Sequence, residues 1–511
     1  MKIKFLVLLK LSILFFFLNT FAIDGDLDLS FGKNEPTNPL QNTGKIITSF
    51  NDDSSVNGMA LQKDGKIIVA GFAGTTPHFA LARYNIDGTL DKSFGATEPT
   101  NPLVGTGKII TKFSDTSSDI ISSIKIQNDG KIIVAGVSNF GRTQNFALAR
   151  YNINGTLDTT FGATEPTNPV SLQGTGKIIL KFNRQDSSAE DLAIQLDGKI
   201  IIVGGVGKYP ARVFGGIQLN SDGVMDKKFG TKGIITTDIR DADLFAKRVV
   251  IDKNKKIIVI GQARINGNLN FAIMRYHSDG SLDISFGANE PTNPLKATGK
   301  IISSFGGTID VARDIVLQKD GKIVVGGQSN AQKLTNFAFA RYNDNGNLDH
   351  SFGENGKVLT KLSSGSLTED ACFSLKIQLD GKILAAGSSA VTNSSNFGLV
   401  RYGKNGLLDK TFGSNQTGIV LTSFDENSKD QAGAIIIQGD GKIIVSGQST
   451  PAKIFNKTSV AGNGIFSSFA IAKYESTVAP CPLPVPRGLT SNLFNALRMK
   501  YVVYCQCTTI G

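Results

Sequence analysis

The chain of 511 residues carries a formal net charge of +11, with 40% hydrophobic and 19% charged residues. These proportions are typical of a globular protein and exclude a chain that is disordered by composition. Residues 1–22 hold three lysines and no acid, so the remainder has a net charge of +8. Spread over a body of this size, such a mild surplus argues against a nucleic-acid-binding surface.

Residues 1–22 have the composition of a secretory signal peptide. Lys2 and Lys4 form a positive start, Leu11–Leu18 is an apolar core, and Thr20–Ala22 supplies small residues for cleavage. The alternative is an uncleaved membrane anchor, which Lys10 disfavours because it leaves the apolar run short of the ~20 residues that span a bilayer. We expect an exported protein that is periplasmic, on the cell surface or secreted.

One stretch, Gln-Lys-Asp-Gly-Lys-Ile-Ile-Val-Ala-Gly at 62–71, organises residues 23–475. It recurs at 127–136, 195–204, 252–261, 318–327, 378–387 and 438–447. Two further markers, Phe79–Tyr84 and Leu90–Gly95, also occur seven times each. The third unit has Gln218-Leu219 in place of Arg-Tyr, and the fourth has Asn254-Lys255 in place of Asp-Gly. A repeat of about 60 residues with short apolar runs is typical of propellers.

Each unit divides into four short strands, which in the first unit are Val56–Leu61, Lys66–Ala70, Phe79–Tyr84 and Gly107–Phe113. A two-residue Asp-Gly loop between the first two strands is a strong hairpin signal. One such sheet cannot bury its own faces, whereas sheets packed radially bury each face against the next. The sequence therefore predicts an all-β fold, a seven-bladed β-propeller of four-stranded antiparallel blades over residues 23–475.

Closure of the ring is predicted from the two ends of the repeat region. Gly44–Phe50 is a lone fourth strand before the first unit, and the last unit stops at Tyr474 after three strands. We therefore expect Gly44–Phe50 to complete the last blade beside Phe469–Tyr474. A polar insert, Glu35–Pro39, recurs in three other units and is expected to form surface loops, because two prolines in five residues cannot lie in a paired strand.

Residues 476–511 have a different character. Pro480–Pro486 predicts a stiff linker, and Cys481, Cys505 and Cys507 lie in this tail, which leaves Cys372 alone in the repeat region. The repeats are therefore not stapled by disulfides. The tail has three open roles: docking on the propeller, contact with a partner or the cell envelope, or partial disorder.

The combination of Leu61–Gly71, Phe79–Tyr84 and Leu90–Gly95 closely resembles the delta-60 repeat, a bacterial β-propeller repeat. The likeness extends over about nine tenths of the chain after residue 22 and is weakest in the third and fourth units. It implies a propeller of exported or surface proteins that generally have no assigned activity. It carries over no catalytic residue.

Binding residues are expected on the face where loops vary between units. The loops between second and third strands differ throughout, and those between one unit and the next are acidic, whereas the other turns are nearly uniform. The acidic side chains either accept hydrogen bonds within their turns or ring the channel mouth and attract cations such as calcium. The candidates are Asp53, Asp119, Glu190, Asp243, Asp310, Asp370, Asp430, Arg142, Tyr209 and Arg264.

Catalytic constellations are missing from the sequence. His78, His277 and His350 occupy non-equivalent places in their units, and there is no nucleophile elbow, phosphate-cradling loop or Cys-x-x-Cys pair. We therefore expect a non-catalytic scaffold without a cofactor that binds a carbohydrate or peptide and no nucleic acid. A structural or adhesive envelope protein is the alternative, and a hydrolase or lyase built from carboxylates is a third.

Overall fold

The computed structural model describes residues 23–141, 143–167, 172–182, 185–363, 369–391, 394–451 and 466–476. The predicted signal peptide and the tail from residue 477 onward lie outside these ranges. All named elements within them are β-strands, as predicted. A search of the described residues finds no helix with the length and hydropathy to cross a membrane.

Five sheets have four antiparallel strands each. Their strands are β2 (Ser54–Leu61), β3 (Ile67–Ala73), β4 (His78–Tyr84) and β5 (Lys108–Thr111); β6 (Asp119–Ile126), β7 (Ile132–Ser138), β8 (Asn145–Tyr151) and β9 (Lys177–Leu180); β10 (Ser187–Ile194), β11 (Ile200–Val206), β12 (Val213–Leu219) and β13 (Ile234–Thr237); β14 (Ala242–Ile251), β15 (Ile257–Ile265), β16 (Asn268–Tyr276) and β17 (Lys300–Ser303); β18 (Asp310–Leu317), β19 (Ile323–Gln332), β20 (Leu334–Tyr342) and β21 (Lys357–Thr360).

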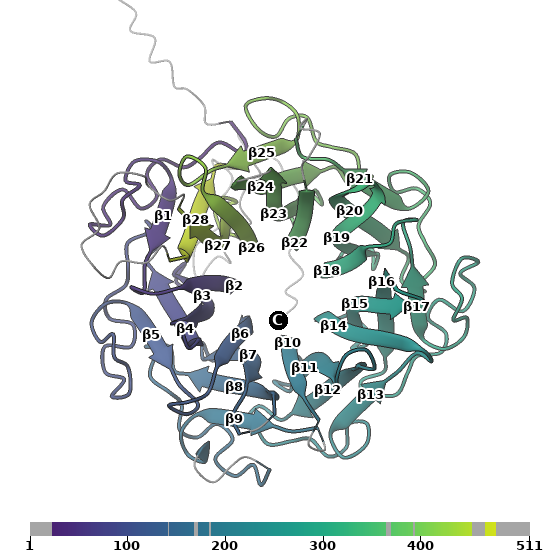
Figure 1. The fold of residues 1–511 in the computed structure, drawn as a ribbon, viewed down its shortest axis with the longest axis horizontal. Coiled ribbons are helices and arrows are strands. Elements are labelled where there is room, and N and C mark those ends of the chain that lie inside the picture. Colours follow the sequence, from purple (N-terminus) through teal and green to yellow (C-terminus); the bar gives the residue numbers. More distant parts are fainter. Residues whose placement is uncertain are drawn as a thin grey trace, which may run out of the picture.

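The remaining strands form one eight-stranded sheet. They are β22 (Glu369–Ile377), β23 (Ile383–Val391), β24 (Ser394–Tyr402) and β25 (Ile419–Thr422), together with β26 (Lys429–Ile437), β27 (Ile443–Thr450), β28 (Ser468–Tyr474) and β1 (Lys45–Thr48). A single parallel bridge between Ser395 and Lys429 joins β24 to β26. Figure 1 shows all the sheets arranged radially around a centre, with β2, β6, β10, β14, β18, β22 and β26 innermost.

The hairpin between the first two strands of a unit differs from the predicted two-residue loop. In the first unit, the Gln62 amide donates to the Lys66 carbonyl oxygen (2.9 Å) and the Gly65 amide donates to the Gln62 carbonyl oxygen (3.0 Å). The loop therefore has three residues, Lys63–Gly65. A two-residue type I′ loop needs two consecutive positive φ angles, and only Gly65, at +83°, has one.

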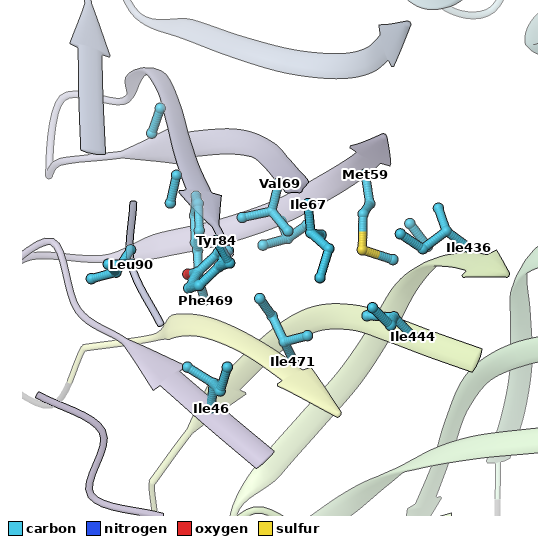
Figure 2. Packing of buried hydrophobic residues seen from close by; sticks show 14 of the residues in the cluster. Ile46, Met59, Ile67, Val69, Tyr84, Leu90, Ile436, Ile444, Phe469 and Ile471 are labelled. Carbon is cyan, nitrogen blue, oxygen red and sulfur yellow. The ribbon is translucent and has the colours of Figure 1, made fainter. Parts of the chain in front are cut away.

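Hydrophobic cores lie between neighbouring sheets, as the repeat pattern predicts. Each buried cluster combines residues of two adjacent sets of strands. In the cluster drawn in Figure 2, Ile67 of β3 points toward Ile471 of β28, and Met59 of β2 points toward Ile444 of β27. Each set of four strands packs both of its faces against neighbouring sets, so none of them has a hydrophobic core of its own.

The predicted pairing of the two ends of the repeat region is confirmed. Strand β1 pairs antiparallel with β28, in a register that sets Lys45 opposite Ala472 and Thr48 opposite Phe469. Ile46 of β1 is fully buried in the cluster of Figure 2. The two segments are therefore joined through the backbone and through the core.

The Glu35–Pro39 insert forms a loop, but its glutamate does not lie on the surface. Glu35 is buried, and its Oε2 accepts a hydrogen bond from the amide of Leu90 in the next unit (2.7 Å). The other copies repeat this bond between Glu98 and Leu157, Glu165 and Met225, and Glu290 and Leu348. A buried amide requires an acceptor, and here the glutamate of one unit supplies the acceptor for an amide of the next. The insert therefore connects consecutive units.

Candidate functional site

Every innermost strand carries a β-bulge at the same place in its unit. The extra residue of a bulge lacks a partner in the ladder, so the strand bends and the side chain is re-aimed. The bulge residues are Asn57, Ser122, Glu190, Lys247, Arg313, Phe373 and Gly433. The residues that follow them are Gly58, Ser123, Asp191, Arg248, Asp314, Ser374 and Ala434.

These two sets of residues line the axial channel. One channel cavity has a volume of about 590 Å³ and is bounded by residues of all the innermost strands. A second, of about 240 Å³, is bounded by the bulge residues and their neighbours at one end of those strands. The bulges therefore determine which side chains meet at the centre of the ring.

The charges in the channel are unevenly distributed around it. Strands β26 and β2 contribute only small or neutral side chains at the bulge, Gly433 and Asn57. A Cβ atom at Gly433 would lie 2.9 Å from the Val56 carbonyl oxygen, so β26 approaches β2 closely. The charged side chains come from the strands on the other side, β6, β10, β14, β18 and β22.

Lys247 and Glu190 form the shortest ion pair of the channel. The Lys247 Nζ lies 2.8 Å from the Glu190 Oε2 and 4.5 Å from the centroid of the Phe245 ring. Burial lowers the pKa of Lys247, although the carboxylate of Glu190 opposes that effect. This pair bridges β10 and β14.

Asp191 links three neighbouring strands. It accepts hydrogen bonds from the Ser123 hydroxyl (2.6 Å) and the Val249 amide (3.0 Å), and the Lys125 Nζ lies 3.6 Å away. Burial by itself raises its pKa, but the charges of Lys125 and Arg248 and these hydrogen bonds outweigh burial, so the pKa is lowered. Asp191 therefore stays ionised.

Asp314 repeats this arrangement two units further on. It accepts a hydrogen bond from the Leu375 amide (2.6 Å), and the Arg248 Nε lies 3.6 Å from its Oδ1. Ser374 takes the same role in the next unit, where its hydroxyl accepts from the Ile435 amide (3.3 Å). The residue after the bulge thus satisfies a backbone donor of the neighbouring strand.

Two channel cations remain without a carboxylate partner among the described residues. Lys376 Nζ makes no hydrogen bond or ion pair there, and burial, with Lys125 and Arg248 nearby, lowers its pKa against the charge of Asp314. The guanidinium of Arg313 donates to Gln328 (3.3 Å) and lies 4.8 Å from the Phe373 ring centroid. Its buried Nε has no acceptor in the described part of the chain.

Four of the predicted binding residues, Asp119, Asp310, Asp370 and Asp430, are fully buried. Each is the first or second residue of an innermost strand. Each accepts a hydrogen bond from an amide just beyond the end of the preceding outer strand, that of Phe113, Phe305, Leu362 or Phe424. The prediction of a carboxylate ring at the channel mouth does not hold for these four, and the alternative of local hydrogen bonding does. Burial raises the pKa of Asp370 and Asp430.

Asp243, Tyr209 and Arg264 lie together. Arg212 pairs with Asp243 through two bonds, Nε to Oδ1 (3.0 Å) and Nη2 to Oδ2 (2.6 Å). The guanidinium carbons of Arg212 and Arg264 lie 5.7 Å and 6.0 Å from the centroid of the exposed Tyr209 ring. None of three cavities, of about 590, 240 and 850 Å³, is lined by these residues, and a ligand-binding role of the varied loops stays a prediction.

The remaining predicted residues do not join these groups. Asp53 is exposed and accepts a hydrogen bond from the Ser467 amide (3.0 Å), and Arg142 lies outside the described residues. His78 is buried, with its Nδ1 3.3 Å from Asp119 Oδ2. Of the predicted acids, only Glu190 faces the channel cavities.

The channel charges were not predicted, although the sequence contains a signal for them. At the bulge, otherwise uniform repeats change from Asn57 and Ser122 to Glu190, Lys247 and Arg313. Alignment of the repeats on the apolar run before each Asp-Gly turn exposes this variation. No group of three or more His, Cys, Asp or Glu side chains in the described ranges is arranged to hold a metal ion.

Five segments of the chain match the family described as "Domain of unknown function (DUF5122) beta-propeller". They cover residues 62–94, 127–161, 253–286, 318–352 and 378–412. No curated protein matches the chain. These segments lie in the first, second, fourth, fifth and sixth units of the repeat. The third and seventh units contain no matched segment.

Solved structures with a similar arrangement include a virginiamycin B lyase from Staphylococcus aureus, with 10% identity and a TM-score of 0.42 over 84% of this chain and 98% of that one. The polysaccharide lyase Uly1 has 10% identity and a TM-score of 0.43 over 82% and 89%. A PL25 ulvan lyase has 12% identity and a TM-score of 0.42 over 78% of this chain and 93% of that one. At these values the likeness carries no inference about activity, and the expectation of a non-catalytic protein stays a prediction.

The matched segments and the radial sheets lead to the same classification. Each segment spans the second strand, the third strand and the following turn of one unit. Together with the ring of antiparallel sheets, the five matches support the assignment of this chain to a β-propeller repeat family.

Proposed function

We propose that this protein is an exported binding scaffold whose axial channel receives an anionic group, a carboxylate or sulfate, of a carbohydrate or peptide ligand. The observation that carries the proposal is the surplus of Lys376 and Arg313 over the three acids of the channel, each of which already has a basic partner. Both side chains are partly buried. Partial burial of a cation without a counter-ion is costly, and an anionic ligand lowers that cost.

The channel geometry supports the same ligand class. Lysine and arginine donate charge-assisted hydrogen bonds, which are stronger than neutral ones. The wall opposite the charges is lined by Gly433, Ala434 and Gly58, which leaves room beside the cations. A cavity of about 590 Å³ lies within the range of small-molecule and sugar sites.

The test is a calorimetric titration at low salt with short oligosaccharides that contain glucuronate, compared with neutral oligosaccharides of equal length and with an acidic peptide. We expect saturable binding of the acidic ligands, weakened by added salt because exposed charge interactions are screened. Lys376→Val should weaken binding by about tenfold or more, the loss of one charge-assisted hydrogen bond.

A matched control keeps the result interpretable. Val316 occupies the position of Lys376 in the preceding unit, so valine fits this place in the repeat. Lys410→Val removes the same charge from an exposed site far from the channel and should leave the affinity unchanged. Equal affinities of the wild type and Lys376→Val, or binding of neutral and acidic ligands alike, would contradict the proposal.

We also propose a ring of seven blades of the delta-60 type, closed by β1. The eight-stranded sheet would then be two blades. Two observations support this count: only one bridge joins β24 to β26, and residues of β23 and β24 pack face to face with residues of β26–β28. The count would be contradicted by an experimental structure in which β24 or β25 pairs with β26 along its whole length through backbone hydrogen bonds.

A further inference from the structure

The arginine of the third strand fills the junction between neighbouring units. In the first unit, Arg83 Nε donates to Asp91 Oδ2 (2.8 Å), and the guanidinium carbon lies 4.4 Å from the centroid of the Phe94 ring. Its Nη1 donates to the carbonyl oxygen of Ile153 in the next unit. An aspartate, an aromatic face and a carbonyl oxygen thus surround the guanidinium.

The same arrangement recurs around the ring. Arg150, Arg275, Arg341 and Arg401 each pair with the equivalent aspartate and lie over the equivalent phenylalanine. In the last unit, Lys473 takes this place, 5.4 Å from the Phe31 ring centroid and 3.5 Å from Asp28. Each of these junctions supplies its own cation.

The third unit is the exception. Gln218 stands where the other units have arginine or lysine. Among the described residues, its amide nitrogen donates only to Gln195 Oε1 (3.1 Å). The groups that would surround a guanidinium are nevertheless present: Asp226, Phe229 and the carbonyl of Ser278 in the next unit. Within the described part of the chain, no group donates to the Ser278 carbonyl oxygen.

A cavity opens at this junction. Its volume is about 850 Å³, and Gln218, Asp226, Phe229 and Ser278 all line it. It extends over the hairpin turns of the third, fourth and fifth units, where Leu196, 64% exposed, gives it an apolar wall. The shorter side chain of Gln218 and a cavity of about 850 Å³ thus coincide at this junction.

Charge at the junction is balanced differently from elsewhere. Asp226 keeps the lysine that its counterparts have, with Lys199 Nζ at 2.8 Å. Lys228 replaces the serine or threonine of the other units, but it forms no ion pair with Asp226 among the described contacts. The hydrogen bond from Lys199 lowers the pKa of Asp226, so the carboxylate is ionised at neutral pH.

We propose that this junction binds a guanidinium group carried on an apolar stem, as in the arginine side chain of a peptide. The group takes the place that Arg150 occupies one junction earlier. Asp226 and the Ser278 carbonyl accept its hydrogen bonds, the Phe229 ring faces its plane, and the apolar wall at Leu196 covers its stem. This site is independent of the channel proposal, because the ligand has the opposite charge.

The test uses N-acetyl-arginine methylamide as the probe and the uncharged citrulline derivative as its control, with binding followed by NMR or calorimetry on the full chain. We expect one saturable site for the arginine probe and at least tenfold weaker binding of the citrulline derivative. Gln218→Arg should abolish binding, because the new side chain fills its own slot. Lys228→Ser should tighten binding by removal of a nearby cation.

Arg150→Gln is the matched variant, since it empties the preceding junction in the same way. We expect the stoichiometry to rise from one probe to two per chain. Gln218→Arg restores the residue of five other units, so it is expected to fold, and a melting curve verifies this. No binding by the wild type, or undiminished binding by Gln218→Arg, would overturn the proposal even if Arg150→Gln does not fold. Lys376→Val should leave the site unaffected.

Discussion

The aspartate that pairs with the third-strand arginine has an unusual acidity. Burial alone would raise the pKa of Asp91, but hydrogen bonds from Lys66 and Ser93 and the charge of Arg83 outweigh burial and lower the pKa to about 2. The same causes lower the pKa of Asp158 and of Asp349 to about 2. The Arg83–Asp91 pair lies within one unit and recurs as Arg150–Asp158 and Arg341–Asp349.

These aspartates should make the stability of the fold decrease at low pH. A carboxyl whose pKa is lower in the folded than in the unfolded state stabilises the fold above the unfolded pKa, near 3.9, and loses that contribution as the pH falls toward 2. We expect their contribution to the melting temperature to be constant from pH 7 to pH 5 and to decline below about pH 4. Asp91→Asn should melt lower at pH 7 and show a shallower acid decline. Equal acid declines for variant and wild type would contradict this.

Lys255 lies in a turn that glycine occupies in the other units. Its φ is +63°, which costs a residue with a side chain about 1 kcal/mol. Lys255→Gly should therefore increase the free energy of unfolding by about 1 kcal/mol. In the opposite direction, Gly321→Lys, at a φ of +89°, should decrease it by a similar amount. Urea unfolding curves measure both, and a destabilised Lys255→Gly would show that the lysine has contacts that outweigh its backbone strain.

The strands are the scale at which the sequence was most informative. Alternation of apolar residues and the position of each Asp-Gly turn predicted β2–β5 within a few residues, and the lone strand at 44–50 predicted the β1–β28 pair. The hairpin loop was wrong by one residue, because Asp-Gly fits both a two-residue and a three-residue turn and only the φ angles distinguish them. The burial of Glu35 was missed because its acceptor role involves an amide of the next unit.

Strand β1 should stabilise the fold as much as the outermost strand of any other unit does. Ile46 of β1 and Ile109 of β5 occupy equivalent positions and are both fully buried. We expect Ile46→Ala and Ile109→Ala to lower the free energy of unfolding by similar amounts, roughly 2–5 kcal/mol each. Chemical denaturation of the two variants provides the comparison. A nearly neutral Ile46→Ala beside a costly Ile109→Ala would show that the β1–β28 pair is dispensable in solution.

The sequence was least informative at the scale of the whole molecule. The varied loops were the predicted binding face, yet the described cavities lie in the channel and over the uniform turns. The channel depends on bulges that bring Glu190, Lys247 and Arg313 to one axis, and no local pattern marks a bulge. The Gln218 junction is different. The substitution itself is visible in the sequence, but the cavity that results can be recognised only when the position of the neighbouring unit is known.

Pairing between β1 and β28 has a consequence for biosynthesis. The ribosome releases residues 45–48 early and residues 468–474 only after nearly all the repeats. Until then, β1 has an open edge, and Ile46 and the apolar face of the first sheet have nothing to cover them. Nascent chains of this protein should therefore depend on a chaperone that shields this edge and prevents premature association between copies.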